Sequence, residues 1–132
     1  MRLRMVAPGR VVLDEPIEAV TFVTGAGEMA VYPGHTRLAA TLLPSCVRAR
    51  FPGGTARVAV SGGFALVGED RVLLIVRTAE RSGDIDVERA RQAAERARAL
   101  LKKAQEGIDY GRARAALARA AARLEAARTS EG

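Results

Sequence analysis

The chain has 132 residues, which is enough for one ordinary domain or for a small domain with an appendage. Its net charge of +6 at pH 7 favours acidic partners of any kind without choosing among them. The single cysteine, Cys46, excludes an intramolecular disulfide, and with one histidine, His35, it leaves too few ligands for a zinc site, so we expect no metal and a reducing compartment.

The N-terminus, residues 1–8, has no long apolar run and no cleavage signature, and no apolar stretch approaches membrane-spanning length. We therefore expect a soluble, unexported protein without direct membrane insertion.

Composition divides the chain near Gly83. Residues 1–83 hold ten of the thirteen Gly and all five Pro, whereas residues 84–132 hold fifteen Ala and no Pro. This shift predicts two parts, residues 1–83 and residues 84–132.

The first part alternates short apolar runs with turn signals, as antiparallel sandwiches and barrels do. We predict strands at Arg10–Leu13, Val20–Thr24, Leu38–Leu43, Val47–Phe51, Arg57–Val60 and Arg71–Val76. Pro52-Gly53-Gly54 is typical of a hairpin connection, and Cys46 is expected to be a small buried residue. The run Val72–Val76 is apolar at every position, which predicts a central strand covered on both faces.

The second part changes to a helical period. Ala90, Ala94, Ala97, Leu101 and Ala104 recur at steps of three and four, and so do Ala113, Leu117, Ala120, Leu124 and Ala127. Gly107 separates the two runs, so an antiparallel two-helix hairpin is predicted. Alanine side chains bury little area, and at about 25 cal/mol per Å² the two helices should hold each other weakly. A hairpin that opens is physically reasonable.

The phrase Ile-Asp-x-x-Arg-Ala occurs at Ile85–Ala90 and again at Ile108–Ala113, each time where a predicted helix begins. Aspartate at that position accepts hydrogen bonds from unpaired backbone N–H groups. An apolar residue before it often packs as a staple. Helix capping alone therefore explains the repeat without any ligand.

Two motifs in the first part are rich in glycine: Gly27-Glu28-Met29-Ala30-Val31-Tyr32-Pro33-Gly34-His35, a turn-rich segment, and Ser61-Gly62-Gly63-Phe64. A β-sandwich carrying these motifs, followed by an Ala-rich hairpin that opens with Asp84-Ile85-Asp86, resembles the epsilon subunit of bacterial F-type ATP synthase. The resemblance covers essentially the whole chain.

The resemblance implies a non-catalytic subunit of the rotor, at the cytoplasmic face of the bacterial membrane, that couples proton passage to ATP synthesis. In this family the sandwich binds the gamma subunit and rests on the ring of c subunits. The hairpin either folds against the sandwich or extends into the alpha/beta catalytic hexamer and inhibits ATP hydrolysis. It further implies an interface, which we place at Glu28, Tyr32, Pro33, Gly34, His35, Ser61, Gly62 and Gly63. The plainer interpretation of His35 is a hydrogen-bonded turn residue.

Several epsilon subunits bind ATP through an Ile/Leu-Asp-x-x-Arg-Ala motif with further arginines, and ATP is thereby implied as a regulatory ligand rather than a required cofactor. The matching residues here are Glu80, Ile85, Asp86, Arg89, Ala90, Arg96, Arg119 and Arg123. Guanidinium groups bind phosphate oxygens through charge-assisted hydrogen bonds, and carboxylates could accept from the adenine amino group. The alternative is a solvated helix face laced with ion pairs, in a hairpin that binds no nucleotide and serves a purely structural coupling role.

Arg112, Arg114 and Arg128 could meet an acidic surface of the beta subunit when the hairpin extends. Arg112, Arg119 and Arg123 share a similar face by spacing, so ATP and the beta subunit would compete for them. A basic nucleic-acid-binding module is a remote alternative, because the chain lacks clustered aromatics and a groove-reading motif. No catalytic residues and no phosphate-loop motif are recognisable, so we expect no enzymatic activity from the chain itself.

Overall fold

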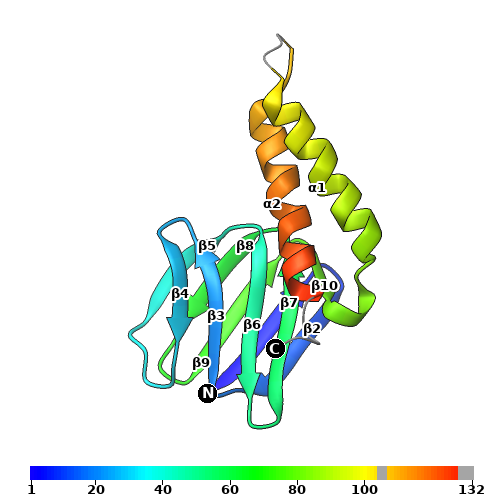
Figure 1. The fold of residues 1–132 in the computed structure, drawn as a ribbon. Helices are drawn as coiled ribbons and strands as arrows, with labels where there is room; N and C mark the ends of the chain where they lie inside the picture. Colours follow the sequence, from blue (N-terminus) through cyan, green and yellow to red (C-terminus); the bar gives the residue numbers. More distant parts are fainter. Residues whose placement is uncertain (104–106, 128–132) are drawn as a thin grey trace.

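The computed structural model describes residues 1–103 and 107–127, in which strands precede two helices (Figure 1). The strands are β1 (Arg2–Ala7), β2 (Arg10–Pro16), β3 (Ala19–Thr24), β4 (Gly27–Val31), β5 (Leu38–Leu42), β6 (Ser45–Phe51), β7 (Gly54–Val60), β8 (Gly63–Val67), β9 (Arg71–Val76) and β10 (Ala79–Arg81). A short 3-10 turn, η1 (Ser82–Asp84), leads into α1 (Val87–Lys102) and then α2 (Tyr110–Ala127). The predicted β-sandwich followed by a helical hairpin is confirmed.

These strands form one curved sheet in the order β10-β7-β6-β3-β5-β8-β9-β1-β2, with β4 paired to β3. The sheet nearly closes on itself, because the Arg10 side chain on β2 donates to the Ala79 carbonyl on β10, at the opposite end of that order. We expected an antiparallel sandwich. One strand pair, β1 with β9, is parallel, so the expectation is wrong for this pair. Side-chain alternation carries no information about the direction of a partner 70 residues away.

The predicted strands lie where the sequence placed them, but the sheet has further strands that were not predicted. Each predicted strand is present, and the Pro52-Gly53 turn joins β6 to β7 as expected. Strands β1, β4, β8 and β10 were not predicted. In particular, the first five residues of the turn-rich segment, Gly27–Val31, form β4 rather than a turn. Pairing with β3 along Val20–Thr24 supplies hydrogen bonds that local glycine content does not reveal.

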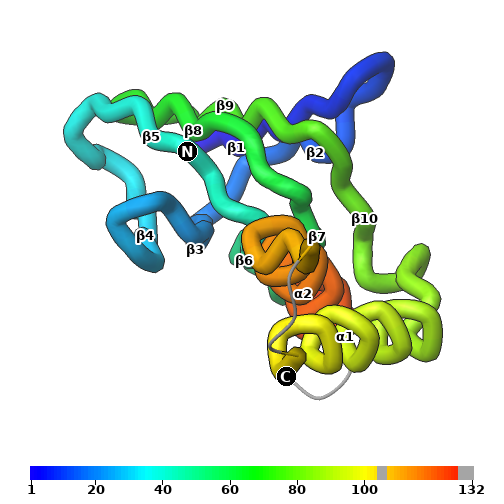
Figure 2. Tube along the Cα trace, turned by 90° about the horizontal axis from the view of Figure 1, so that it is seen from above, coloured from blue at the N-terminus to red at the C-terminus, as the bar shows by residue number. Residues whose placement is uncertain are grey.

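The prediction that Val72–Val76 is covered on both faces is wrong. Val72, Leu74 and Val76 are buried in the core, but Leu73 is only half-buried and Ile75 is 42% exposed. The helices lie over β6 and β7, and they leave the outer face of β9 bare (Figure 2). This strand therefore presents an apolar outer surface instead of lying inside the molecule.

The hairpin stacks on the sheet through α2, and α1 is the outermost layer (Figure 2). The predicted seam is confirmed at its alanines, since Ala90, Ala94, Ala97, Ala113 and Ala120 are buried. Leu101, Leu117, Leu124 and Ala127 are half-buried, and Ala104 lies outside the described residues.

A second buried face on α2 was not predicted. Ala122 and Ala126 pack against Cys46 and Ala59 of the sheet. Cys46 is a free, buried thiol, as expected. The four buried residues of this contact have small side chains, and Ile85 packs against them half-buried, so the contact buries little apolar area.

Candidate functional site

A cavity of about 420 Å³ lies where the hairpin joins the sheet. It receives residues from β10, η1, α1 with its N-cap, and α2. Its lining is Glu80, Asp84, Asp86, Arg89, Ala90, Ala93, Arg96 and Arg123. Six of the eight residues that the sequence singled out for nucleotide binding are therefore brought together. We call this space the junction cavity.

Asp86 is the N-cap of α1, and its carboxylate accepts from the backbone N–H of Arg89 at 3.0 Å. Asp109 accepts from the backbone N–H of Arg112 at the same distance, at the start of α2. Capping therefore accounts for the repeated phrase, as its simplest explanation predicted. Asp86 also lines the junction cavity, so capping and a contact with a ligand are compatible at this residue.

Arg89 and Arg96 lie seven residues apart on one face of α1, and both side chains are exposed. Among the described residues, neither guanidinium has a hydrogen-bond or ion-pair partner. Each offers several donors in a planar fork that suits phosphate oxygens. These two arginines supply unneutralised positive charge to the α1 wall of the cavity.

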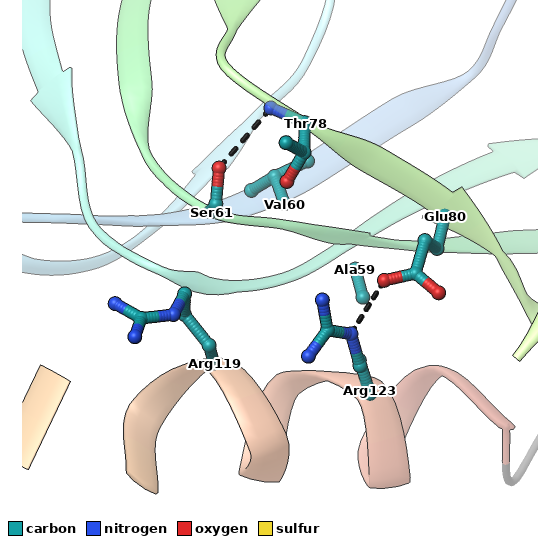
Figure 3. Close-up of a pocket in the computed structure, with 7 residues that line it drawn as sticks. All are labelled: Ala59, Val60, Ser61, Thr78, Glu80, Arg119 and Arg123. Carbon is teal, nitrogen blue, oxygen red and sulfur yellow. Dashed lines mark hydrogen bonds and ion pairs between the residues drawn. The ribbon is translucent and has the colours of Figure 1, made fainter. Parts of the chain in front are cut away.

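Arg119 and Arg123 rise from α2 toward the sheet (Figure 3). The Arg123 guanidinium forms an ion pair with Glu80 on β10, and both side chains are about one third exposed, at 37% and 34%. Arg119 lines a small neighbouring pocket together with Ser61 and Thr78, not the junction cavity. Because Glu80 and Arg123 line both spaces, Arg119 lies one pocket away from the arginines of α1.

Ile85 is the other predicted residue that does not line the cavity. It is half-buried against the small cluster formed by Cys46, Ala59, Ala122 and Ala126. Its position is that of an anchor between the first turn of the hairpin and the sheet. Conversely, sequence reasoning missed Asp84 and Ala93; the i, i+4 spacing of Ala93 from Arg89 was the one available signal.

Cys46 lies beneath α2 at the centre of the contact between the hairpin and the sheet. Burial raises the pKa of its thiol to about 11, and the negative charge of Glu125 adds to the shift. The guanidinium groups of Arg48 and Arg57 lower this pKa in part. The thiol is therefore protonated and inert at neutral pH while α2 covers it.

The segment Tyr32–His35 follows β4 at the end of the sheet opposite the hairpin (Figure 1). The backbone N–H of Gly34 donates to the Glu69 carbonyl at 2.8 Å, which ties this segment to the β8–β9 turn. The Nδ1 of His35 donates to the Thr36 carbonyl at 2.6 Å. Tyr32 is 53% exposed. His35 thus has the local hydrogen bond of a turn residue, and Tyr32 presents a free ring.

Glu28, one of the residues placed at the implied subunit interface, has a partner within the chain. Its carboxylate lies 2.6 Å from the Arg48 guanidinium. The Glu28 side chain is 60% exposed, so this ion pair lies at the surface. Surface pairs of this kind contribute about 0–1 kcal/mol and exchange readily for other partners.

The β7–β8 connection, Ser61–Gly62, is hydrogen-bonded to the β9–β10 connection, Arg77–Thr78. Ser61 Oγ accepts from the Thr78 N–H at 3.1 Å, and the Gly62 carbonyl accepts from the Arg77 N–H at 3.1 Å. Gly63 has φ +154°, and a Cβ placed there would lie 1.9 Å from the Ile75 carbonyl oxygen. The glycine motif therefore has a structural reason to exist, whatever else it contacts.

A further surface feature lies on the outer face of β8 and β9. Phe64, Leu66 and Ile75 are 59%, 43% and 42% exposed. Phe64 is paired with Ile75, and Leu66 with the half-buried Leu73, so these side chains form one continuous patch. We call it the apolar patch. A contiguous exposed apolar surface is typical of an interface with another protein.

Two family models match the chain in sequence order. The beta-sandwich domain of the ATP synthase Delta/Epsilon chain matches residues 1–82, and the long alpha-helix domain of the same chain matches residues 84–128. The chain belongs to the ATP synthase epsilon family. A similar curated relative, the ATP synthase epsilon chain of Staphylococcus haemolyticus, is 44% identical over 128 residues, 96% of each chain. That of Moorella thermoacetica is also 44% identical, with the same coverage.

Solved structures agree with this assignment. A chain in the mitochondrial ATP synthase of Euglena gracilis, determined as an OSCP/F1/c-ring assembly, has a TM-score of 0.80 and 31% identity, and the match covers 95% of this chain and 79% of that one. A chain of the Tetrahymena thermophila central stalk and c-ring structure shares the fold, with a TM-score of 0.56 at 12% identity.

The resemblance noted from the sequence is thereby confirmed. The epsilon-family chain is a non-catalytic, central-stalk component of ATP synthase rather than an enzyme in its own right. No helix within residues 1–103 and 107–127 is long and apolar enough to cross a membrane.

Proposed function

We propose that the chain couples proton translocation to ATP synthesis as a rotor subunit at the cytoplasmic face of the bacterial membrane, and that its hairpin inhibits ATP hydrolysis under the control of ATP. The junction cavity is the observation that carries this proposal. Its walls come from the sheet, from α1 and from α2, and it holds the guanidinium groups of Arg89, Arg96 and Arg123. A polyanion bound there would contact all three elements at once.

ATP fits this lining by charge and by hydrogen bonding. The three arginines supply donors for phosphate oxygens, and the carboxylates of Glu80 and Asp86 supply acceptors for the adenine amino group. Arg119, in the adjoining pocket, is placed to contribute once Arg123 moves from Glu80 toward a phosphate. The chain has no Gly-x-x-x-x-Gly-Lys-Ser/Thr sequence, so ATP acts here as a ligand and not as a substrate.

Binding at the junction would stabilise the folded hairpin, because the site is complete only when α1, α2 and β10 are together. A ligand that binds one arrangement alone stabilises it by about 2.7 kcal/mol at one hundred times its dissociation constant. Alanine contacts and one part-exposed ion pair hold α2 to the sheet without ligand. This stabilisation by a ligand is large compared with the free energy that such contacts contribute to docking of α2.

The sandwich is proposed to dock on the gamma subunit and the c ring. The apolar patch, built from Phe64, Leu66 and Ile75, suits a stable apolar interface such as one with gamma. The Tyr32–His35 segment lies at the end of the sheet remote from the hairpin and suits contact with the c ring (Figure 1). Glu28, near the other end of β4, is proposed to join this interface through its exposed side chain. The Ser61–Gly63 segment lies at the hairpin end of the sheet, is hydrogen-bonded to Arg77 and Thr78, and is proposed to extend the interface beyond Phe64.

In the extended state the arginines of α2 are proposed to contact the beta subunit of the alpha/beta hexamer. Arg112 and Arg114 are exposed even in the folded hairpin, whereas Arg119 and Arg123 are half-buried against the sheet. Extension would release the latter pair. ATP and the beta subunit would then compete for Arg119 and Arg123. Arg128, also considered for this surface, lies outside the described residues.

Calorimetry on the isolated chain tests nucleotide binding. Wild-type protein should bind ATP, and Arg89→Ala and Arg123→Ala should each weaken binding at least about tenfold, since a lost charge-assisted hydrogen bond is worth about 1.5–3 kcal/mol. Arg91→Ala is the matched control, because Arg91 pairs with Glu88 outside the junction cavity. Equal ATP affinity in the wild type and both cavity variants would exclude the proposed site.

Deleting residues 84–132 tests the inhibitory role of the hairpin. The truncated chain keeps the whole sheet, so it should still assemble with the gamma subunit. ATP hydrolysis by the reconstituted complex should rise relative to the complex with the full chain. Hydrolysis that stays the same after verified assembly would remove inhibition from the proposal while leaving the coupling role intact.

A second candidate is a hairpin with a structural coupling role and no nucleotide. Two observations favour it: Asp86 is already used as a helix cap, and Glu80 already neutralises Arg123. This candidate predicts no ATP-dependent heat from the wild-type chain at millimolar concentrations. The same calorimetric experiment therefore separates the two functions.

A further inference from the structure

Three arginines gather on the outer face of the sheet, away from the junction cavity. Arg48 and Arg50 point outward from β6, and Arg57 from β7, where it is the direct cross-strand partner of Arg48. We call these three residues the arginine cluster. They lie on the rows next to Cys46 and Ala59, at the margin of the surface that α2 covers.

The arginine cluster borders a shallow concavity of about 180 Å³. Its floor is made of short side chains on β3, because Ala19 is paired with Arg50 and Thr21 with Arg48. The ring of Tyr32 forms the opposite wall. Long cationic side chains facing an aromatic ring across a floor of small residues leave room for a segment of another molecule.

The positive charge here is only partly neutralised. Glu28 pairs with Arg48, while Arg50 and Arg57 have no side-chain partner among the described residues. Like charges directly opposite each other on neighbouring strands destabilise a sheet, and Arg48 and Arg57 occupy such positions. The stability of the fold does not explain why two arginines lie opposite each other. An anionic partner bound to both would explain it.

We propose that the arginine cluster docks an acidic, extended segment of another subunit of the ATP synthase complex. The anion that the structure shows on the cluster is a carboxylate, that of Glu28. Arg48 and Arg50 are two residues apart on one strand, so their Cα atoms are separated by about 6.6 Å. Alternate side chains of an extended segment have the same spacing, so two carboxylates in such a segment match the two guanidinium groups.

The inference rests on membership of the complex and is independent of ATP binding at the hairpin. The arginine cluster and the junction cavity share no residue. Variants of the cluster should therefore leave the calorimetric titration with ATP unchanged. A failure of either proposal can be recognised without reference to the other.

Zero-length carbodiimide cross-linking of the assembled complex is the direct test. The reagent joins amines to carboxylates, and the chain has lysine only at Lys102 and Lys103, so Arg50→Lys and Arg57→Lys each add one reactive amine while keeping the charge. Each variant should give a cross-link, mapped by mass spectrometry, to an Asp or Glu of another subunit. Arg98→Lys, on the exposed part of α1, is the matched control.

The expected cross-link yield from Arg50→Lys and Arg57→Lys is at least about tenfold above that of Arg98→Lys, as expected for amines held within ion-pair distance of a carboxylate. Links confined to Glu28 of the same chain, or yields equal to the control, would overturn the proposal.

Charge reversal gives an independent measurement. The double variant Arg50→Glu and Arg57→Glu should bind the complex lacking this chain at least about tenfold more weakly at low salt, and the loss should shrink at high salt because exposed charges are screened. Circular dichroism of the free variant verifies its fold. Unchanged affinity at low salt, or binding of inorganic phosphate at the cluster without any mapped cross-link, would contradict a protein docking surface.

Discussion

At the residue scale, Gly63 shows how closely the backbones of β8 and β9 approach each other. Its φ of +154° is rarely adopted by other residues, and a side chain would collide with the Ile75 carbonyl. The motif Ser-Gly-Gly-Phe was recognisable from the sequence as a sign of unusual backbone shape. The contact that requires glycine was not, because it joins β8 to β9 across a turn.

Gly63→Ala should lower the free energy of unfolding by about 3 kcal/mol or more, because the backbone must shift to relieve the clash. Urea denaturation measures this change. Gly83→Ala is the control, since no atom lies within 4 Å of a Cβ built at Gly83 and its φ is not in the left-handed range. Equal stability of the two variants would mean that the close approach at Gly63 is relaxed in solution.

The site residues also differ in whether the local sequence or only a tertiary contact determines where they lie. Arg89 and Arg96 could be placed together from helical spacing alone, and Asp86 from its position at a helix start. The Glu80–Arg123 ion pair joins β10 to α2 and is a tertiary contact. Periodicity indicates which residues share a face, but not which element that face meets.

At the element scale, α2 has two buried faces. The sequence predicted the seam with α1 from its four- and three-residue steps, and it missed Ala122 and Ala126, which meet the sheet. In an alanine-rich helix the buried and exposed faces have similar side chains, so the sequence does not show which face packs. Likewise, the apolar run of β9 predicted burial on both faces, and only the arrangement of the helices shows that one face stays bare.

Ala126→Arg should detach α2 from the sheet, because Ala126 is fully buried against the sheet cluster and has no room for a long cation. The reaction of Cys46 with a thiol reagent at pH 8 reports this release. Each 1.4 kcal/mol lost from the docked state raises the open population about tenfold. Ala121→Arg, on the exposed side of α2, is the control and should react at the wild-type rate. Equal rates for the two variants would show that α2 does not gate the thiol.

At the scale of the whole molecule, surfaces with different chemistry occupy different parts of one sheet. The junction cavity lies at the hairpin, the apolar patch on β8 and β9, and the arginine cluster on β6 and β7. The Tyr32–His35 segment lies at the far end (Figure 1). The junction cavity shares no lining residue with the other surfaces, whereas Tyr32 belongs both to the Tyr32–His35 segment and to the concavity at the arginine cluster. The proposed regulation requires movement of the hairpin alone.

ATP at the junction cavity is proposed to keep the hairpin on the sheet. This role of ATP can be tested by measuring the rate at which Cys46 reacts with a thiol reagent at pH 8, at increasing ATP concentrations. The covered thiol, with a pKa of about 11, stays protonated, so reaction requires opening of α2.

At one hundred times the dissociation constant, ATP should slow the Cys46 reaction about a hundredfold, and in Arg89→Ala the same ATP concentration should have far less effect. A wild-type rate that does not change while calorimetry shows ATP bound would show that ATP does not keep α2 on the sheet.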